Sequence, residues 1–130
     1  MGKQKLIFIV DDDPFILKLV RSRLEAKDHS VKTFLYGEEC LEQMHLAPDL
    51  IILDFLFHHD ERENVLDGKG ILEKIQASSK DVPVIMLSGQ EDGDVVLELA
   101  RMGIKDYVIK DHDFIDNLLT VVNDLLENQV

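Results

Sequence analysis

A short apolar segment that ends in a carboxylate limits most strongly how this chain can fold. Residues Leu50 to Leu53 form a continuous apolar run, which is typical of a strand buried on both faces of a parallel sheet. Asp54 follows directly, and a carboxylate is not stable in such an interior without a partner. We therefore expect Asp54 to emerge at the carboxyl end of the strand, the edge of an open parallel sheet where ligands bind.

The composition indicates one globular domain that does not bind nucleic acid directly. The chain has 130 residues, 45% hydrophobic and 31% charged, which is enough to bury a core. Its formal net charge of −12 argues against nucleic acid and against an anionic membrane surface as partners. Cys40 is the single cysteine, so an internal disulfide is excluded, and no apolar segment is long enough for a membrane span or a signal peptide. We expect a cytoplasmic location.

Apolar runs and helical periodicities alternate along the whole chain. Predicted strands cover residues 6–10, 30–35, 50–53, 82–87 and 107–109. Predicted helices cover residues 14–27, 38–46, 68–77, 95–102 and 114–126, the first capped by Asp13 and the fourth closed by Gly103. This alternation predicts an α/β fold, a three-layer doubly wound sheet of five parallel strands in the flavodoxin-like order 2-1-3-4-5. We expect residues 1–130 to form this single domain.

Four of the predicted strands deliver polar side chains to the same edge of the sheet. These side chains are Asp11 and Asp12 after the first strand, Asp54 after the third, Ser88 after the fourth and Lys110 after the fifth. Clustered carboxylates repel one another, and a hard cation such as Mg²⁺ relieves the repulsion. A cation, a hydroxyl and an ammonium group together suit a phosphoryl group, which a central aspartate can accept. Each residue alone would more often be a cap, a turn residue or a surface charge, but their joint arrival favours a site.

Four segments of the sequence resemble the receiver domains of two-component response regulators. The segments are Ile9–Pro14, Pro48–Asp54, Pro83–Gly89 and Gly103–Lys110, and they follow one another in the order and spacing of the family. The resemblance covers essentially the whole chain. It implies a phosphorelay protein that is not an enzyme, and we expect no output domain within these 130 residues.

The resemblance also implies how a phosphoryl group would be transferred and sensed. Asp54 would accept it from a phosphohistidine on a partner histidine kinase or histidine phosphotransfer protein. Lys110 would neutralise the phosphoaspartate, and Ser88 would turn its hydroxyl toward the phosphoryl oxygen. Tyr107 stands at the aromatic switch position and would rotate inward, its resting ring being packed at a strand edge. A downstream protein or a second copy of the chain would bind the face formed by the fourth helix, fifth strand and fifth helix.

The same resemblance implies a Mg²⁺ site with four protein ligands. Asp12 would bind the ion directly and Asp11 through water. Asp54 and the backbone carbonyl of Leu56 would complete the set.

The chain departs from the family pattern at two places beside the site. The family usually has a proline four residues after the phosphorylated aspartate and a glycine about eight residues after it, whereas here position 58 is histidine and the glycine is Gly68. The loop over 57–67 is therefore enlarged, and we favour a solvated loop over a transition-metal site at 58–61. Asp111 replaces a proline whose preceding peptide bond is typically cis; because a cis bond to a non-proline residue costs about 2.5–4 kcal/mol, we expect a trans bond.

Two other functions stay open at this point. Asp11 and Asp13 after an apolar strand, with Ser88 and a later lysine, resemble the motifs of haloacid-dehalogenase-like phosphatases, although this leaves Asp54 without a role. A non-phosphorylated pseudo-receiver, an interaction module only, is the second alternative, because the loop and Asp111 depart from the family. A phosphoryl label on Asp54, and not on Asp11, would argue against the phosphatase. A spectrum that does not respond to Mg²⁺ and beryllofluoride would favour the pseudo-receiver.

Overall fold

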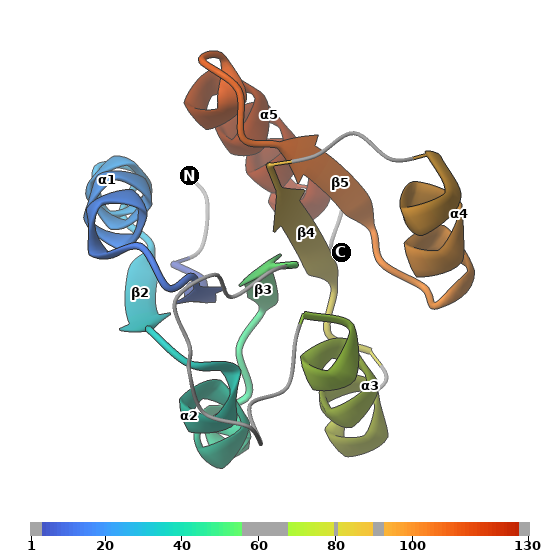
Figure 1. Ribbon diagram of the computed structural model, residues 1–130. Coiled ribbons are helices and arrows are strands. Elements are labelled where there is room, and N and C mark those ends of the chain that lie inside the picture. Colours follow the sequence, from blue (N-terminus) through green and yellow to red (C-terminus); the bar gives the residue numbers. More distant parts are fainter. Residues whose placement is uncertain (1–3, 56–67, 80, 90–92, 128–130) are drawn as a thin grey trace.

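A parallel sheet of five strands, ordered β2-β1-β3-β4-β5, forms the centre of the molecule and has helices on both faces (Figure 1). The computed structural model describes residues 4–55, 68–79, 81–89 and 93–127. The strands are β1 (Leu6–Val10), β2 (Ser30–Phe34), β3 (Leu50–Asp54), β4 (Val84–Ser88) and β5 (Asp106–Ile109). The helices are α1 (Pro14–Glu25), α2 (Gly37–Glu42), α3 (Gly68–Ser78), α4 (Gly93–Arg101) and α5 (Phe114–Glu127), with a 3₁₀ turn η1 at Met44–Leu46. The predicted fold class and strand order are confirmed.

Two separate hydrophobic clusters cover the two faces of the sheet. Successive side chains of a strand point to opposite faces, so Ile7 and Ile9 of β1 belong to one cluster and Phe8 and Val10 to the other. The first cluster includes apolar residues of α1 and α5, and the second includes those of α2, α3 and α4. Since both faces are covered, β3 and β4 are buried along their whole length. This explains why these strands read as unbroken apolar runs.

The helix boundaries differ from the predicted ones where the chain turns. The prediction of one helix over 38–46 was wrong: α2 ends at Glu42, and the separate turn η1 is followed by Ala47 in a left-handed conformation with φ of 55°. Ala47 precedes Pro48, and a residue before proline is disfavoured in a right-handed helix. Helix α1 ends at Glu25, two residues before the predicted end. Within the described ranges, no helix is both long enough and apolar enough to cross a bilayer.

Candidate functional site

The strand register brings the predicted polar residues to one edge of the sheet. Val10 pairs with Leu53, Asp54 with Leu87 and Ser88 with Ile109. The carboxyl ends of these four strands therefore lie side by side, as expected for parallel neighbours. The side chains that follow or end them share this edge.

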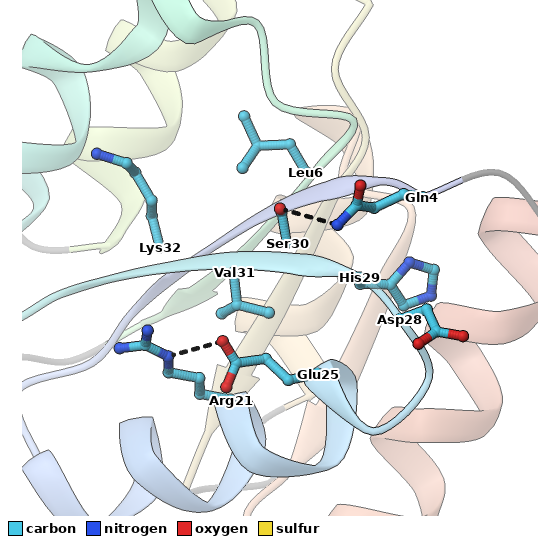
Figure 2. Close-up of a pocket in the computed structure, with 9 residues that line it drawn as sticks. All are labelled: Gln4, Leu6, Arg21, Glu25, Asp28, His29, Ser30, Val31 and Lys32. Carbon is cyan, nitrogen blue, oxygen red and sulfur yellow. Dashed lines mark hydrogen bonds and ion pairs between the residues drawn. The ribbon is translucent and has the colours of Figure 1, made fainter.

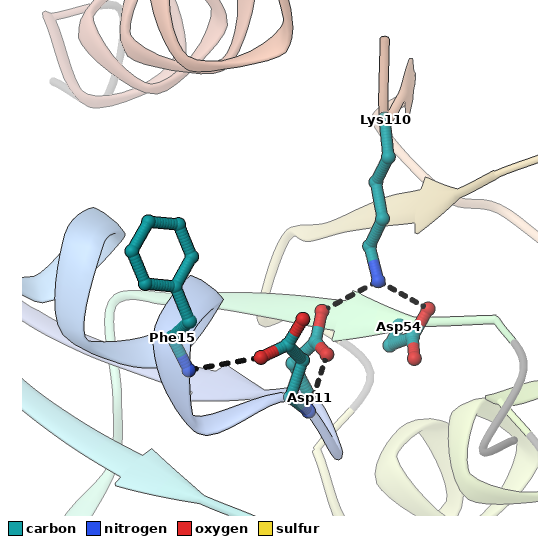
Figure 3. Close-up of polar contacts among 5 residues, drawn as sticks. Asp11, Phe15, Asp54 and Lys110 are labelled. Atoms are coloured by element: carbon teal, nitrogen blue, oxygen red, sulfur yellow. Dashed lines mark hydrogen bonds and ion pairs between the residues drawn. The ribbon is translucent and has the colours of Figure 1, made fainter. Parts of the chain in front are cut away.

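Lys110 joins the acidic residues of two different strands. Its Nζ atom lies 2.7 Å from Oδ2 of Asp11 and donates a hydrogen bond of 3.1 Å to Oδ1 of Asp54. Figure 3 shows the lysine side chain extending to both carboxylates. The backbone N–H of Lys110 donates to the carbonyl of Ser88 at 2.8 Å, which fixes the start of this side chain to the end of β4. Asp11, Asp54 and Lys110 thus form one ionic cluster.

The acidic part of the cluster has the donors that a hard cation requires. Asp11, Asp12 and Asp54 each offer a carboxylate oxygen, and these oxygens lie within 4.8 Å of one another. Oδ2 of Asp54 is buried and has no hydrogen-bond partner among the described residues. The ammonium group of Lys110 contacts Asp11 and Asp54, and the repulsion among the three neighbouring carboxylates favours a further cation. An oxygen-rich, partly unsatisfied site of this kind fits Mg²⁺.

Burial and mutual repulsion shift the pKa values of the cluster. Desolvation, and after it the charge of Asp11, raises the pKa of Asp54 from 3.8 to about 7, although Lys110 acts in the opposite direction. Desolvation likewise raises the pKa of Asp11. Burial alone would lower the pKa of Lys110, but its contacts with Asp11 and Asp54 outweigh burial and raise it. The lysine is therefore held in its charged form beside carboxyl groups that bind protons more tightly than usual.

Gly68 contacts the backbone that carries Asp54, which the sequence analysis did not anticipate. A Cβ atom at position 68 would lie 2.5 Å from the carbonyl oxygen of Asp54 and 2.6 Å from Cα of Phe55. The N–H of Gly68 donates to the carbonyl of Phe55 at 2.8 Å. Despite its late position in the sequence, this glycine begins α3 directly against the end of β3. A glycine at the start of an amphipathic helix was the only signal for such a close approach.

The structure describes two of the other predicted site residues, Ser88 and Tyr107, but not Leu56. Ser88 is buried at the end of β4, and Tyr107 is half-buried in β5 and packs against the cluster that includes Met86. Leu56 and the enlarged loop lie outside the described residues, so the carbonyl ligand and the 58–61 segment stay predictions. No peptide bond in the described ranges is cis, in agreement with the trans bond predicted before Asp111.

Asp13 is a helix cap, as predicted. Its carboxylate accepts a hydrogen bond of 2.9 Å from the N–H of Phe15, and Pro14 occupies the first helical position. The N–H of Asp13 in turn donates to Oδ1 of Asp11 at 2.9 Å. Asp13 therefore supports the acidic cluster from outside it. This weakens the phosphatase alternative, in which Asp13 would act beside Asp11.

A pocket at the opposite end of the sheet is separate from this site. Figure 2 shows its lining of Gln4, Leu6, Arg21, Glu25, Asp28, His29, Ser30, Val31 and Lys32, from α1 and the starts of β1 and β2. Arg21 pairs with Glu25, and Gln4 donates to Ser30. Because Leu6 and Ser30 begin their strands, this pocket lies at the amino ends, away from Asp54.

Comparisons with known proteins agree with this geometry. The family model described as "Response regulator receiver domain" matches residues 7–123. The chain is 38% identical over 109 residues to a probable transcriptional regulator ycf27 of Cyanidium caldarium, covering 83% of this chain and 41% of the relative. It is 32% identical over 105 residues to the transcriptional regulatory protein CssR of Bacillus subtilis, covering 80% of this chain and 44% of the relative. The chain thus spans less than half the length of these relatives.

Solved structures give the same result. A structure described as the BeF3-activated DrrB receiver domain superimposes with a TM-score of 0.83 at 32% identity, covering 97% of this chain and 100% of the other. The response regulator DrrB of Thermotoga maritima, an OmpR/PhoB homologue, gives 0.83 at 31% identity, covering 98% of this chain and 54% of the other.

Proposed function

Because this chain belongs to the response regulator receiver domain family of two-component systems, we propose that Asp54 accepts a phosphoryl group from a phosphohistidine of a partner protein. The observation that carries this proposal is the position of Lys110 between two buried carboxylates, while Oδ2 of Asp54 has no hydrogen-bond partner among the residues that the structure describes. The partner would be a histidine kinase or a histidine phosphotransfer protein, and the transfer would take place in the cytoplasm.

Each oxygen of Asp54 has its own part in the proposed step. Oδ2, which has no hydrogen-bond partner in the described part of the chain, attacks phosphorus while the P–N bond to the histidine of the donor breaks and its electron pair returns to the imidazole. Oδ1 stays hydrogen-bonded to Lys110. The ammonium group is then adjacent to the new phosphoaspartate and offsets part of its added charge. Lys110 therefore stabilises the acceptor before transfer and the product after it.

Asp11, Asp12 and Asp54 would hold Mg²⁺, with the carbonyl of Leu56 as a further ligand. Such an ion would supply positive charge against the phosphoryl oxygens. Asp11 contacts Lys110 through Oδ2 and Asp13 through Oδ1, so both of its oxygens are oriented by protein groups. This arrangement agrees with a contribution of Asp11 through water and a direct contribution of Asp12.

Ser88 and Tyr107 would pass the signal from the site to the surface. Ser88 ends β4 next to Asp54, and Met86 of the same strand pairs with Tyr107 of β5. A phosphoryl group on Asp54 would draw the Ser88 hydroxyl inward, and the half-buried Tyr107 ring would follow into the space that it leaves. The phosphoryl group thus shifts an equilibrium between two arrangements of β4 and β5.

The charge of α4, β5 and α5 favours a downstream partner over a second copy of the chain. These elements carry one exposed cation, Arg101, and six exposed carboxylates, on Asp94, Glu98, Asp106, Asp116, Asp124 and Glu127; Glu98 is paired with Lys69 of α3. In a symmetric dimer the same patch would face itself, and like charges would oppose the contact. A pocket between β5 and α5, lined in part by Tyr107 and Thr120, could receive a side chain of the partner. We therefore propose a partner with a basic surface.

Beryllofluoride, which mimics an acyl phosphate, tests the function without a cognate kinase. With Mg²⁺ and beryllofluoride together, we expect the amide signals of Ser88, Gly89 and Tyr107 to shift in nuclear magnetic resonance spectra. Mg²⁺ alone should shift only signals near the acidic cluster, and Asp54→Asn should abolish the beryllofluoride response. Signals that stay unmoved in the wild type would favour the pseudo-receiver alternative.

A further inference from the structure

Asp111 occupies the turn that leads from the functional lysine into the last helix. It stands where the family usually has proline, and its backbone N–H, which a proline lacks, donates to the carbonyl of Ile109 at 2.8 Å. A hydrogen bond between residues two apart closes a three-residue turn, and Lys110 is its central residue. Lys110 does not have a positive φ, so the turn is of the inverse γ type that is common at strand ends.

The side chain and the carbonyl of Asp111 bind the start of α5. Oδ1 accepts a hydrogen bond of 2.9 Å from the N–H of Asp113, and the carbonyl accepts one of 3.2 Å from the N–H of Phe114, the first residue of α5. An aspartate that accepts from the backbone two residues later forms a local turn that orders the chain before a helix. Asp111 therefore contacts both the strand end before Lys110 and the helix after it.

Helix α5 is itself firmly attached to the sheet. Leu118, Val122 and Leu126 are buried in the cluster that it shares with α1. The backbone N–H of Lys110 is bound to Ser88 at the end of β4. The backbone of Lys110 is thus held on one side by the sheet and on the other, through Asp111, by a packed helix. These contacts fix the direction in which the Cα–Cβ bond of Lys110 leaves the backbone.

We propose that Asp111 is a positioning residue, whose backbone N–H and carboxylate together aim the ammonium group of Lys110 at Asp11 and Asp54. A proline in this position would supply neither the backbone N–H nor the carboxylate. The inference rests on the proposed function only for its consequence, because the aim of Lys110 can be measured without metal or phosphoryl group.

The reactivity of Lys110 toward trace amounts of an acetylating reagent reports whether its ammonium group is held against Asp11 and Asp54. In the wild type the ammonium group is paired and largely buried, so Lys110 should react more slowly than the exposed Lys105. Asp111→Pro removes the donor and the carboxylate, and we expect Lys110 to react about threefold to tenfold faster relative to Lys105, the range expected for losing a hydrogen bond. Asp111→Ala retains the N–H and should give a smaller rise. Asp111→Asn retains both functions and should behave as the wild type.

Two controls distinguish a changed orientation of the Lys110 side chain from a general loss of folding. His112→Ala alters an exposed side chain of the same loop and should leave the reactivity of Lys110 unchanged. Circular dichroism and urea unfolding identify any variant that fails to fold, in which case the alanine variant replaces the proline variant. Wild-type reactivity in Asp111→Pro, or an equal increase in Asp111→Asn, would overturn the proposal.

The affinity for beryllofluoride in the presence of Mg²⁺ gives a second, independent measurement. Asp111→Pro should weaken this affinity in the wild-type background but have no further effect when Lys110 is already alanine, because Asp111 acts through Lys110. An equal loss in both backgrounds would overturn the proposal. Failure of the wild type to bind beryllofluoride would contradict the proposed function instead, and would leave the acetylation result standing as a test of the aim.

Discussion

At Asp54, burial and a neighbouring lysine act on one carboxyl group in opposite directions. Desolvation and the charge of Asp11 raise its pKa, Lys110 lowers it, and the result of about 7 shows that burial outweighs the ion pair. Under the proposed function, this buried carboxyl group is the one that a cation or a phosphoryl group would reach. A buried carboxyl group with a raised pKa lowers stability near neutral pH, a cost that is common in functional sites.

The pKa of Asp54 predicts how stability depends on pH. The unfolded chain releases this proton near 3.8 and the folded chain near 7, so the folded state holds the proton more tightly and the free energy of unfolding falls as pH rises between these values. In metal-free buffer at about pH 8, we expect Asp54→Asn to raise the free energy of unfolding by about 2–4 kcal/mol. Urea denaturation measures this difference.

The comparison at low pH supplies the control for that prediction. Below the unfolded-state pKa of 3.8 Asp54 is protonated in both states, so wild type and variant should unfold alike. Saturating Mg²⁺ at high pH should remove most of the difference, because the ion would stabilise the charged carboxylate. A variant that is less stable than the wild type at high pH would show that the ion pair with Lys110 outweighs the burial of Asp54.

Among the elements, those with strong apolar patterns could be predicted from the sequence. β3 and β4 are buried on both faces, so unbroken apolar runs and the residues that end them were enough to place Asp54 and Ser88. Contacts that depend on the path of the chain could not be predicted in this way. The approach of Gly68 to Phe55 joins segments separated by an enlarged loop, and the hydrogen bonds of Asp111 depend on a turn conformation that no periodicity indicates.

The contact between β3 and α3 predicts a specific effect of one methyl group. In Gly68→Ala the added carbon would meet backbone atoms of Asp54 and Phe55, which cannot rotate away. We expect the free energy of unfolding to fall by about 1–3 kcal/mol, as for other overpacked sites. The affinity for beryllofluoride should fall as well, because relief of the clash displaces the backbone of Asp54. Chemical denaturation and the beryllofluoride titration measure the two effects.

Gly93→Ala is the matched control for this variant. Gly93 also begins a helix, but an added Cβ there meets nothing within 4 Å among the described residues. Its free energy of unfolding should stay unchanged or rise by up to about 1 kcal/mol, because alanine favours the helix. If both glycine variants behaved alike, the close contact at Gly68 would not limit this part of the fold.

Over the whole molecule, charge is distributed unevenly and predicts the oligomeric state. The described residues of α1 to β2 include the exposed cations Lys18, Arg21, Arg23, Lys27 and Lys32, whereas α4, β5 and α5 are mainly acidic. We expect the protein activated with Mg²⁺ and beryllofluoride to stay monomeric at low ionic strength in analytical ultracentrifugation. The repulsion between two copies of the acidic face of α4, β5 and α5 is least screened there. A dimer at low salt that dissociates as salt is added would contradict this charge argument.

Over the whole chain, the family match and the fold both identify a receiver domain. The receiver-domain model spans residues 7–123, and the superposition on the DrrB receiver domain covers 97% of the chain. The relatives CssR and ycf27 are more than twice as long as the matched segment, so their complete activities exceed what this domain accounts for. The activity that we propose for the domain itself is the transfer of a phosphoryl group to Asp54 at the edge of the sheet.

The position of that phosphoryl group is the most direct test. After incubation with phosphoramidate and Mg²⁺, the acyl phosphate is trapped by borohydride reduction and located by peptide mass spectrometry. We predict modification of Asp54 alone, none in Asp54→Asn or after chelation of Mg²⁺, and full modification in Asp13→Asn, which keeps the helix cap. Modification of Asp11, or no modification of the wild type under these conditions, would contradict the account.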